Sequence, residues 1–198
     1  MTHINARSRL RSHAIIESWA KPNDGTRSLI ESAMVPELAT AIRDWSRAHV
    51  ADCVLIGGLA LAFHGRARMT SDCDFLFLSA QSIPAEVPGF KRLRAHAFRH
   101  NATHVEFEVL DPEFLKMEPD LVHRIWSSAD EVDGLRVASR VGLIASKLGR
   151  FSRQDQADIE HLLDGQDAAS LEAIFEELSD FPLSQHQRAL LSQFQTEL

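Results

Sequence analysis

The sequence predicts an α+β fold, with a small mixed sheet and flanking helices in its first half and a helical C-terminal half. Two observations carry this prediction. Between residues 53 and 111, short apolar runs of strand length alternate with turn residues and one helical segment. After Asp111, apolar residues instead recur every three or four positions over most of the chain. With 198 residues, 44% of them hydrophobic and 25% charged, the chain has the composition of a globular protein of one domain, with or without a small appendage.

Composition divides the chain into three regions. Residues 1–26 are polar and form an N-terminal extension, residues 27–138 form the α/β core, and residues 139–198 form the helical C-terminal region. No apolar run approaches the ~20 residues that a membrane span requires, and no signal-peptide apolar region follows the basic start. Cys53 and Cys73 fall within predicted strands, as the buried, reduced thiols of cytoplasmic proteins do. We therefore expect a cytoplasmic protein that does not contact a membrane.

The net charge of −7 argues against a protein that coats nucleic acid, but it leaves room for a local basic groove. A basic cluster precedes one of the later strands and could bind an RNA backbone; its members are Lys91, Arg92, Arg94 and Arg99. The acidic chain contains no tyrosine and gives this interpretation little further support.

The first elements follow from local patterns. Pro36 predicts the first position of a helix, where proline is favoured. "CVLIGG" predicts a strand ended by glycines, "LALAFHG" a helix stopped by Gly65, and "DCDFLFL" a second strand. "SIPAEVPG" predicts a loop, because its prolines and glycine interrupt both the helical and the strand periodicity.

The later elements are mainly helical. "LRAHAFRH" and "THVEFEVLD", separated by "NA", predict a hairpin, and "ADEVDGLRVAS" predicts a short strand pair that turns at Asp133-Gly134. Helices are expected over residues 112–127, 139–150, 153–164, 168–179 and 184–196.

Two carboxylates open the second strand. Residues i and i+2 of a strand share a face, so Asp72 and Asp74 should project together, with Cα atoms ~6.6 Å apart. Such carboxylates repel each other unless a cation lies between them, and Mg²⁺ prefers oxygen ligands of this kind. The alternative is a turn residue at Asp72 and an edge charge at Asp74. A strand that is otherwise Phe and Leu is a poor place for an unpaired carboxylate.

Two further features complete a candidate site. Gly57 and Gly58 separate a predicted strand from a helix, where a phosphate can approach the backbone; a tight turn is the alternative. Glu106 and Glu108 share a face of a later strand. If this strand lies beside the aspartate strand, one glutamate could join the acidic pair; otherwise the face is simply solvated. No dinucleotide-binding, P-loop, zinc or nucleophile-elbow motif is present.

This combination resembles the polymerase-beta-type nucleotidyltransferase superfamily. The features that carry the resemblance are a glycine pair opening a helix, "HGRARMT", D-x-D on a strand and an acidic residue on a later strand. Within the superfamily the sequence is most similar to AbiEii-type toxins and related nucleotidyltransferase-like domains. "LIASKLGRFSRQDQADIEHLL" is similar to that group's lysine-bearing helix followed by a helix with acidic residues. The resemblance covers roughly residues 50 to 165, and it implies a nucleotidyltransferase-type sheet.

The resemblance also implies a reaction and its residues. A nucleoside monophosphate would pass from a nucleoside triphosphate to an acceptor, with Mg²⁺ (or Mn²⁺) as cofactor. Asp72 and Asp74 match the metal-binding pair. Glu108 best matches the third carboxylate, with Glu106 as the alternative, although the family usually has aspartate there. The nucleotide-binding residues implied are Gly57, Gly58, Arg68, Thr70, Lys147 and Asp158.

Lys147 has a second interpretation. It belongs to a cationic stripe with Arg140 and Arg150 on one helix edge, which we expect to be exposed. Lys147 would either contact the triphosphate or pair with Asp158 across the helix junction. Asp155 fits a capping box with Ser152 at the start of the next helix.

The acceptor stays open between an RNA end, a protein and a small molecule. The resemblance implies a toxin of a toxin–antitoxin or phage-defence system, with an antitoxin as partner. An alternative is a catalytically weakened binding module of the same fold that acts through a protein partner. A third possibility, an aminoglycoside-type small-molecule nucleotidyltransferase, would need an acidic pocket for a cationic acceptor.

Overall fold

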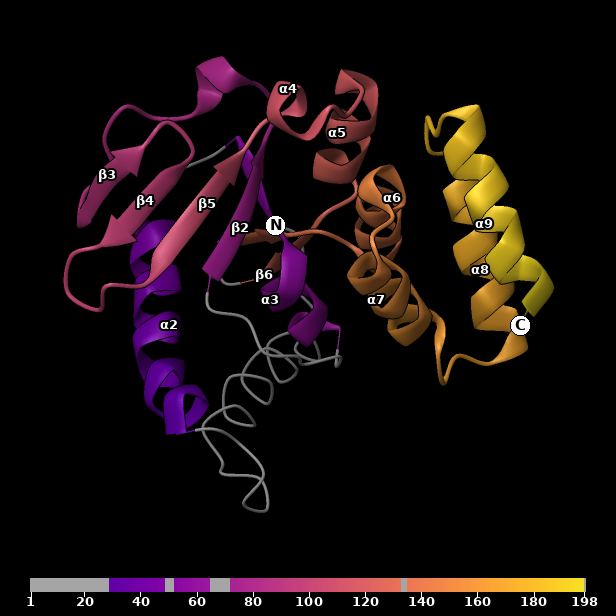
Figure 1. Ribbon diagram of the computed structural model, residues 1–198, viewed down its shortest axis with the longest axis horizontal. Coiled ribbons are helices and arrows are strands. Elements are labelled where there is room, and N and C mark those ends of the chain that lie inside the picture. Colours follow the sequence, from indigo (N-terminus) through magenta and orange to yellow (C-terminus); the bar gives the residue numbers. More distant parts are fainter. Residues whose placement is uncertain (1–28, 49–51, 65–71, 133–134, 198) are drawn as a thin grey trace, which may run out of the picture.

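A computed structural model describes residues 29–48, 52–64, 72–132 and 135–197 of the chain (Figure 1). The described part has an α+β fold with a mixed sheet and a helical C-terminal half, so the predicted fold class is confirmed. The predicted N-terminal extension, residues 1–26, lies outside the described residues, as does the predicted helix stop at Gly65. The division of the chain at residues 26 and 138 stays a prediction.

Seven strands form one sheet in the order β3-β4-β5-β2-β1-β7-β6. In chain order they are β1 (Cys53–Ile56), β2 (Asp72–Phe77), β3 (Phe90–Arg94), β4 (Ala97–His100), β5 (Glu106–Leu110), β6 (Asp130–Val132) and β7 (Leu135–Val137). The pairs β2–β5 and β1–β7 are parallel, and the other neighbours are antiparallel. The strand of the aspartates therefore lies beside the strand of the two glutamates, as the candidate site requires.

The helices lie around this sheet and continue beyond it (Figure 1). They are α2 (Leu29–Arg47), α3 (Gly57–Phe63), α4 (Pro112–Leu115), α5 (Pro119–Ser127), α6 (Arg140–Arg150), α7 (Arg153–Leu163), α8 (Ala168–Ser179) and α9 (Gln185–Glu197), with a 3₁₀ turn at Ala80–Ser82. The last four agree with the predicted C-terminal helices to within a residue or two at each end. No helix in the described part of the chain is long and apolar enough to cross a membrane.

One face of the sheet packs under α2 around a single tryptophan. The Trp45 ring lies 5.0 Å from the rings of Phe75 and Phe107, measured between centroids, and 5.8 Å from that of Phe98. These phenylalanines are fully buried. Because side chains alternate between the two faces of a strand, Asp74, Glu106 and the other neighbours of these phenylalanines belong to the opposite face. Burial of the aromatic face thus fixes the register that gathers the acidic residues.

Three predicted boundaries are wrong. Pro36 does not begin a helix, because α2 already starts at Leu29; the preceding "LIESAMV" consists mostly of good helix formers. The predicted helix 112–127 is two helices. Lys116 ends α4 in the left-handed conformation at φ 52°, and Pro119, which cannot continue a helix, starts α5.

The segment "LRAHAFRH" is also not one strand. β3 ends at Arg94, the chain turns at Ala95 and His96, and β4 begins at Ala97. The hairpin of β4 and β5 across "NA" is confirmed, and the short pair of β6 and β7 is confirmed as well. The additional strand β3 forms the edge of the sheet and is separated from the glutamate strand β5 by β4.

Candidate active site

The four predicted carboxylates form two cross-strand pairs on the adjacent strands β2 and β5. In the parallel pairing of β2 and β5, Asp72 is in register with Glu106, and Asp74 is in register with Glu108. Neighbouring strands lie ~4.8 Å apart, so each pair is within reach of a shared ligand. The side chain of Asp72 lies outside the described part of the structure. The condition that the two strands be neighbours is therefore met, whereas metal binding stays a prediction.

Gly57 has a structural reason to be glycine. Its φ of +70° is in the left-handed region, and a Cβ built on it would overlap Oδ2 of Asp74 and lie 2.8 Å from the Asp74 Cγ. The contact arises because Ile56, the preceding residue, pairs with Asp74 across β1 and β2. The glycine turn and the acidic strand are thus in direct contact, as the proposed phosphate and metal functions would require. Gly58 is buried within α3.

Both glutamates of β5 are paired with arginines, Glu106 with Arg99 of β4 and Glu108 with Arg94 of β3. Arg94 Nη2 lies 3.3 Å from Glu108 Oε1, and Arg99 Nη2 lies 2.5 Å from Glu106 Oε1. The arginine side chains are 65% and 44% exposed, and the glutamates about 40%. These are solvent-accessible ion pairs, which carry little net stability. The glutamates therefore face water and are available for exchange of partner.

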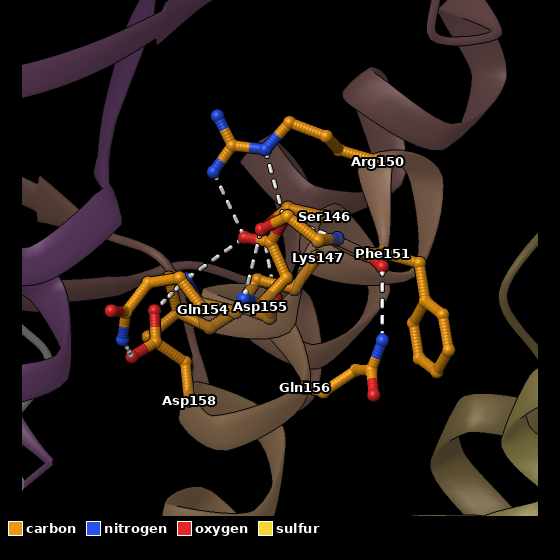
Figure 2. Close-up of polar contacts among 10 residues, drawn as sticks. Ser146, Lys147, Arg150, Phe151, Gln154, Asp155, Gln156 and Asp158 are labelled. Atoms are coloured by element: carbon orange, nitrogen blue, oxygen red, sulfur yellow. Dashed lines mark hydrogen bonds and ion pairs between the residues drawn. The ribbon is translucent and has the colours of Figure 1, made fainter.

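A second group of charges lies between α6 and α7, and it is buried (Figure 2). Lys147 is only 6% exposed, and its Nζ lies 2.5 Å from Asp158 Oδ2 and 3.7 Å from Asp155 Oδ1. Gln154 donates to the other oxygen of Asp158 at 2.9 Å. The expectation that Lys147 is exposed is wrong, because the helix junction encloses the ammonium between two carboxylates. The predicted pairing with Asp158 is confirmed.

Arg150 is the exposed cation next to this buried cluster. Its guanidinium donates two hydrogen bonds to Asp155, at 2.8 and 3.0 Å, while its side chain remains 75% exposed. The hydrogen bond with Asp155 raises the pKa of Arg150, and the negative charge of Asp74 raises it further. Arg150 is therefore an exposed cation that two hydrogen bonds to Asp155 hold in place.

Asp155 is the centre of this arrangement. Burial raises the pKa of its carboxyl, but hydrogen bonds from Arg150 and Ser152 more than offset this and bring the pKa down to about 2. The predicted capping box of Ser152 and Asp155 is confirmed, since each side chain bonds the backbone N–H of the other residue. Arg140, the remaining member of the predicted cationic stripe, donates to the carbonyl of Leu162. Each of the three cations of the stripe therefore binds a carboxylate or a backbone carbonyl of the protein.

The donor atoms present suit a hard divalent cation. Asp74 and Glu108 supply carboxylate oxygens on neighbouring strands, the ligand type that Mg²⁺ prefers. Among the side chains that the structure describes, no three His, Cys, Asp or Glu residues converge tightly enough to hold a metal ion. Asp72 would have to complete the set, and Glu108 would have to exchange Arg94 for the metal. Arg68 and Thr70, predicted to bind nucleotide, lie outside the described residues.

The fold and the family agree on the class of protein. A glycine turn, an acidic strand and a later strand with acidic residues are the features on which the resemblance to nucleotidyltransferases rests, and the structure places the two strands side by side. The sequence model of the family described as "Nucleotidyltransferase of unknown function (DUF6036)" matches residues 35–196. Because the match covers most of the chain, the chain belongs to this family. The match supports the superfamily but not a particular closeness to AbiEii-type toxins, and a comparison with curated proteins finds no match.

Proposed function

We propose that this protein transfers a nucleoside monophosphate from a nucleoside triphosphate to an acceptor. The observation that carries the proposal is the register of β2 and β5, which sets Asp72 beside Glu106 and Asp74 beside Glu108 on the face opposite the aromatic core. Gly57 adds to it, since its backbone packs directly against the Asp74 carboxylate. Membership of a family described as nucleotidyltransferases supports the same chemistry.

In this proposal Asp72, Asp74 and Glu108 hold Mg²⁺ (or Mn²⁺), with Glu106 as the alternative third carboxylate. Bound there, the metal would polarise phosphate oxygens and neutralise their charge. The acceptor hydroxyl oxygen attacks the α-phosphorus, the bond from that phosphorus to the bridging oxygen breaks, and pyrophosphate leaves. The hydroxyl proton passes to a neighbouring glutamate, which acts as general base.

The remaining residues of the site bind and position the triphosphate. Gly57 and Gly58 would let a phosphate approach the backbone, and Arg68 and Thr70 are proposed on resemblance alone. Arg150 joins the candidates because it is exposed and lies within electrostatic reach of Asp74. Direct contact of Lys147 and Asp158 with the nucleotide remains a prediction. Their enclosed ion pair, linked to Arg150 through Asp155, supports a positioning role as well.

The wider biology is also a proposal. A cytoplasmic toxin of a toxin–antitoxin or phage-defence system, controlled by an antitoxin, is consistent with a nucleotidyltransferase that modifies a cellular acceptor. Expression of the protein should then arrest growth, and Asp74→Asn should relieve the arrest. Growth that is unaffected by the wild-type protein, or equally arrested by the variant, would remove the toxin role.

One observation favours the alternative of a catalytically weakened binding module. Both candidates for the third carboxylate are glutamates already paired with arginines. Incubation with each labelled nucleoside triphosphate, Mg²⁺ and either total RNA or total protein separates the two functions. The transferase proposal expects label on one product with the wild type and none with Asp74→Asn. Absence of label from every product, at protein concentrations above that of the acceptor, would favour the binding module.

A further inference from the structure

Charged residues cross the sheet in a row that changes sign halfway. Lys91 on β3 pairs with Arg99 on β4, Arg99 pairs with Glu106 on β5, and Glu106 is in register with Asp72 on β2. Read from the sheet edge inward, the four positions are two cations followed by two anions. The row thus runs from a basic edge to the proposed catalytic aspartates.

A second row lies beside the first and also runs from a cation to two anions, with the uncharged Ala97 in its second position. Arg94 on β3 pairs with Ala97 on β4, Ala97 with Glu108 on β5, and Glu108 with Asp74 on β2. Three exposed cations therefore occupy the outer part of one surface, which we call the basic edge: Lys91, Arg94 and Arg99. β3, β4 and β5 lie side by side, on the opposite side of the molecule from α8 and α9 (Figure 1).

The basic edge belongs to the face that α2 does not cover. Phe98 of β4 and Phe107 of β5 pack against Trp45 under α2, so their neighbours Arg99 and Glu106 belong to the other face. Arg92 provides the contrast on the same strand. Its guanidinium lies over the Phe98 ring, 5.5 Å from the centroid, and donates to carbonyls of the β3–β4 turn. Arg92 therefore stabilises the β3–β4 turn and is not counted in the basic edge.

We propose that the basic edge binds the phosphodiester backbone of a nucleic-acid strand whose end is the acceptor at Asp72 and Asp74. This inference rests on the proposed function and names its acceptor. Charge complementarity carries it, because cations lie where a strand would run and carboxylates lie where its terminal hydroxyl would react. Three strand spacings separate Lys91 from Asp72, about 14 Å, a distance that a short stretch of single strand can span. A cationic small-molecule acceptor would meet repulsion along the same edge.

The arginine–glutamate pairs can exchange partners when a nucleic-acid strand binds the basic edge. Each pair is exposed and contributes little net stability, so a phosphate can replace a glutamate at little cost. The guanidinium matches a phosphate in a bidentate geometry. A strand that occupies Arg94 and Arg99 therefore leaves Glu108 and Glu106 free for a divalent cation. Nucleic acid and Mg²⁺ should each strengthen the binding of the other, because such coupling is reciprocal.

Fluorescence anisotropy with a labelled 12-nucleotide single-stranded RNA tests the inference on the full chain. The double variant Lys91→Gln/Arg94→Gln should bind at least tenfold more weakly than the wild type. The slope of log affinity against log salt should decrease in magnitude by about 1.4, since each lost contact to a single strand accounts for ~0.7. The matched control Arg92→Gln/Lys116→Gln removes the same charge outside the basic edge and should stay within twofold. Melting temperatures establish that both variants are folded.

The other outcomes of the RNA-binding assay either support or overturn the inference. Equal losses in test and control variants would overturn the inference, since only net charge would then matter. It would also be overturned if polyglutamate displaced the RNA as effectively as unlabelled RNA of equal charge, because the edge would then fit an acidic polypeptide. DNA of the same sequence, run in parallel, shows whether the 2′-hydroxyl is recognised; preference for either strand supports the inference. Failure to bind RNA at low salt, with Mg²⁺-dependent nucleotide binding intact, overturns this inference alone. Failure of both removes the proposed function.

Discussion

Two sets of ion pairs, one between α6 and α7 and one across β3, β4 and β5, differ in exposure. The cluster between α6 and α7 encloses Lys147 between Asp155 and Asp158, with side chains that are 6% exposed or less. On the sheet, Glu106 pairs with Arg99 and Glu108 with Arg94, and each of these four side chains is about 40% exposed or more. The same chemical groups therefore experience two very different environments.

The difference separates a fixed part of the site from an exchangeable one. Breaking a buried pair leaves an uncompensated charge and costs roughly 3–5 kcal/mol, whereas an exposed pair contributes about 0–1 kcal/mol. The helix junction should therefore hold Arg150 in one place. The glutamates, by contrast, can leave their arginines when a metal ion or a phosphate offers a better partner.

Removal of the buried ammonium should have the largest effect. Lys147→Ala leaves Asp155 and Asp158 buried without their shared cation and should destabilise the fold by roughly 3–5 kcal/mol, measured by urea denaturation. Lys91→Ala, which removes an exposed lysine, is the control and should change stability by less than about 0.5 kcal/mol. A loss below 1 kcal/mol in Lys147→Ala, with weaker nucleotide binding, would show that the lysine serves the triphosphate rather than the helix junction.

Acid should weaken the buried cluster in a defined window. The pKa of Asp155 is about 2 in the folded protein and 3.8 ordinarily, so the folded state resists protonation. Its stabilisation of about 2 kcal/mol is fully present above pH ~4 and is lost as the pH falls toward 2. Urea unfolding between pH 5 and 2 measures it, and Arg150→Gln, which removes two hydrogen bonds from Asp155, should flatten the profile. An unchanged profile in this variant would contradict the role given to Arg150.

The glycine turn can be tested by adding one carbon. Gly57→Ala must hold a φ of +70°, which costs roughly 1–2 kcal/mol, and its Cβ must displace the Asp74 carboxylate. We expect a modest drop in melting temperature together with a disproportionate loss of transfer activity. Gly89→Ala is the matched control, because Gly89 has a φ of +82° and open space around its Cβ position. Equal activity losses in the two variants would mean that the turn does not act through Asp74.

The exposed pairs should show the smallest effect on stability and a clear effect on function. Glu106→Gln and Glu108→Gln should each change stability by less than about 1 kcal/mol. Glu108→Gln should reduce transfer activity by ~10² more than Glu106→Gln if Glu108 is the third carboxylate. Each variant is the control for the other. Small and equal losses would favour the binding module.

Local patterns predicted most of the fold. Alternation in "HVEFEVL" and apolar spacing in the C-terminal half gave strands and helices that the structure confirms. The errors came from taking Pro36 as a helix start although good helix formers precede it, and from a turn without glycine at Ala95 and His96. No proline or glycine marks that turn, so the edge strand β3 was hidden in a longer run.

The candidate site was only partly predictable. Spacing predicted that Asp72 and Asp74 share a face, but the sequence posed the adjacency of their strand and the glutamate strand only as a condition, which the pairing of β2 with β5 meets. The burial of Lys147 could not be predicted, because it depends on how closely α6 and α7 pack. The sequence also gave no sign that Arg94 and Arg99 pair with the two glutamates. That relation depends on the register of three strands, in which the missed strand β3 contributes Arg94.

Calorimetric titration of nucleoside triphosphates with and without Mg²⁺ tests the proposed active site most directly. The wild type should bind nucleotide in a Mg²⁺-dependent manner. Asp72→Asn/Asp74→Asn should abolish this binding while keeping or raising the melting temperature, because two like charges are removed from one site. Nucleotide binding by the double variant that still depends on Mg²⁺, or loss of its fold, would contradict a catalytic metal site at these aspartates.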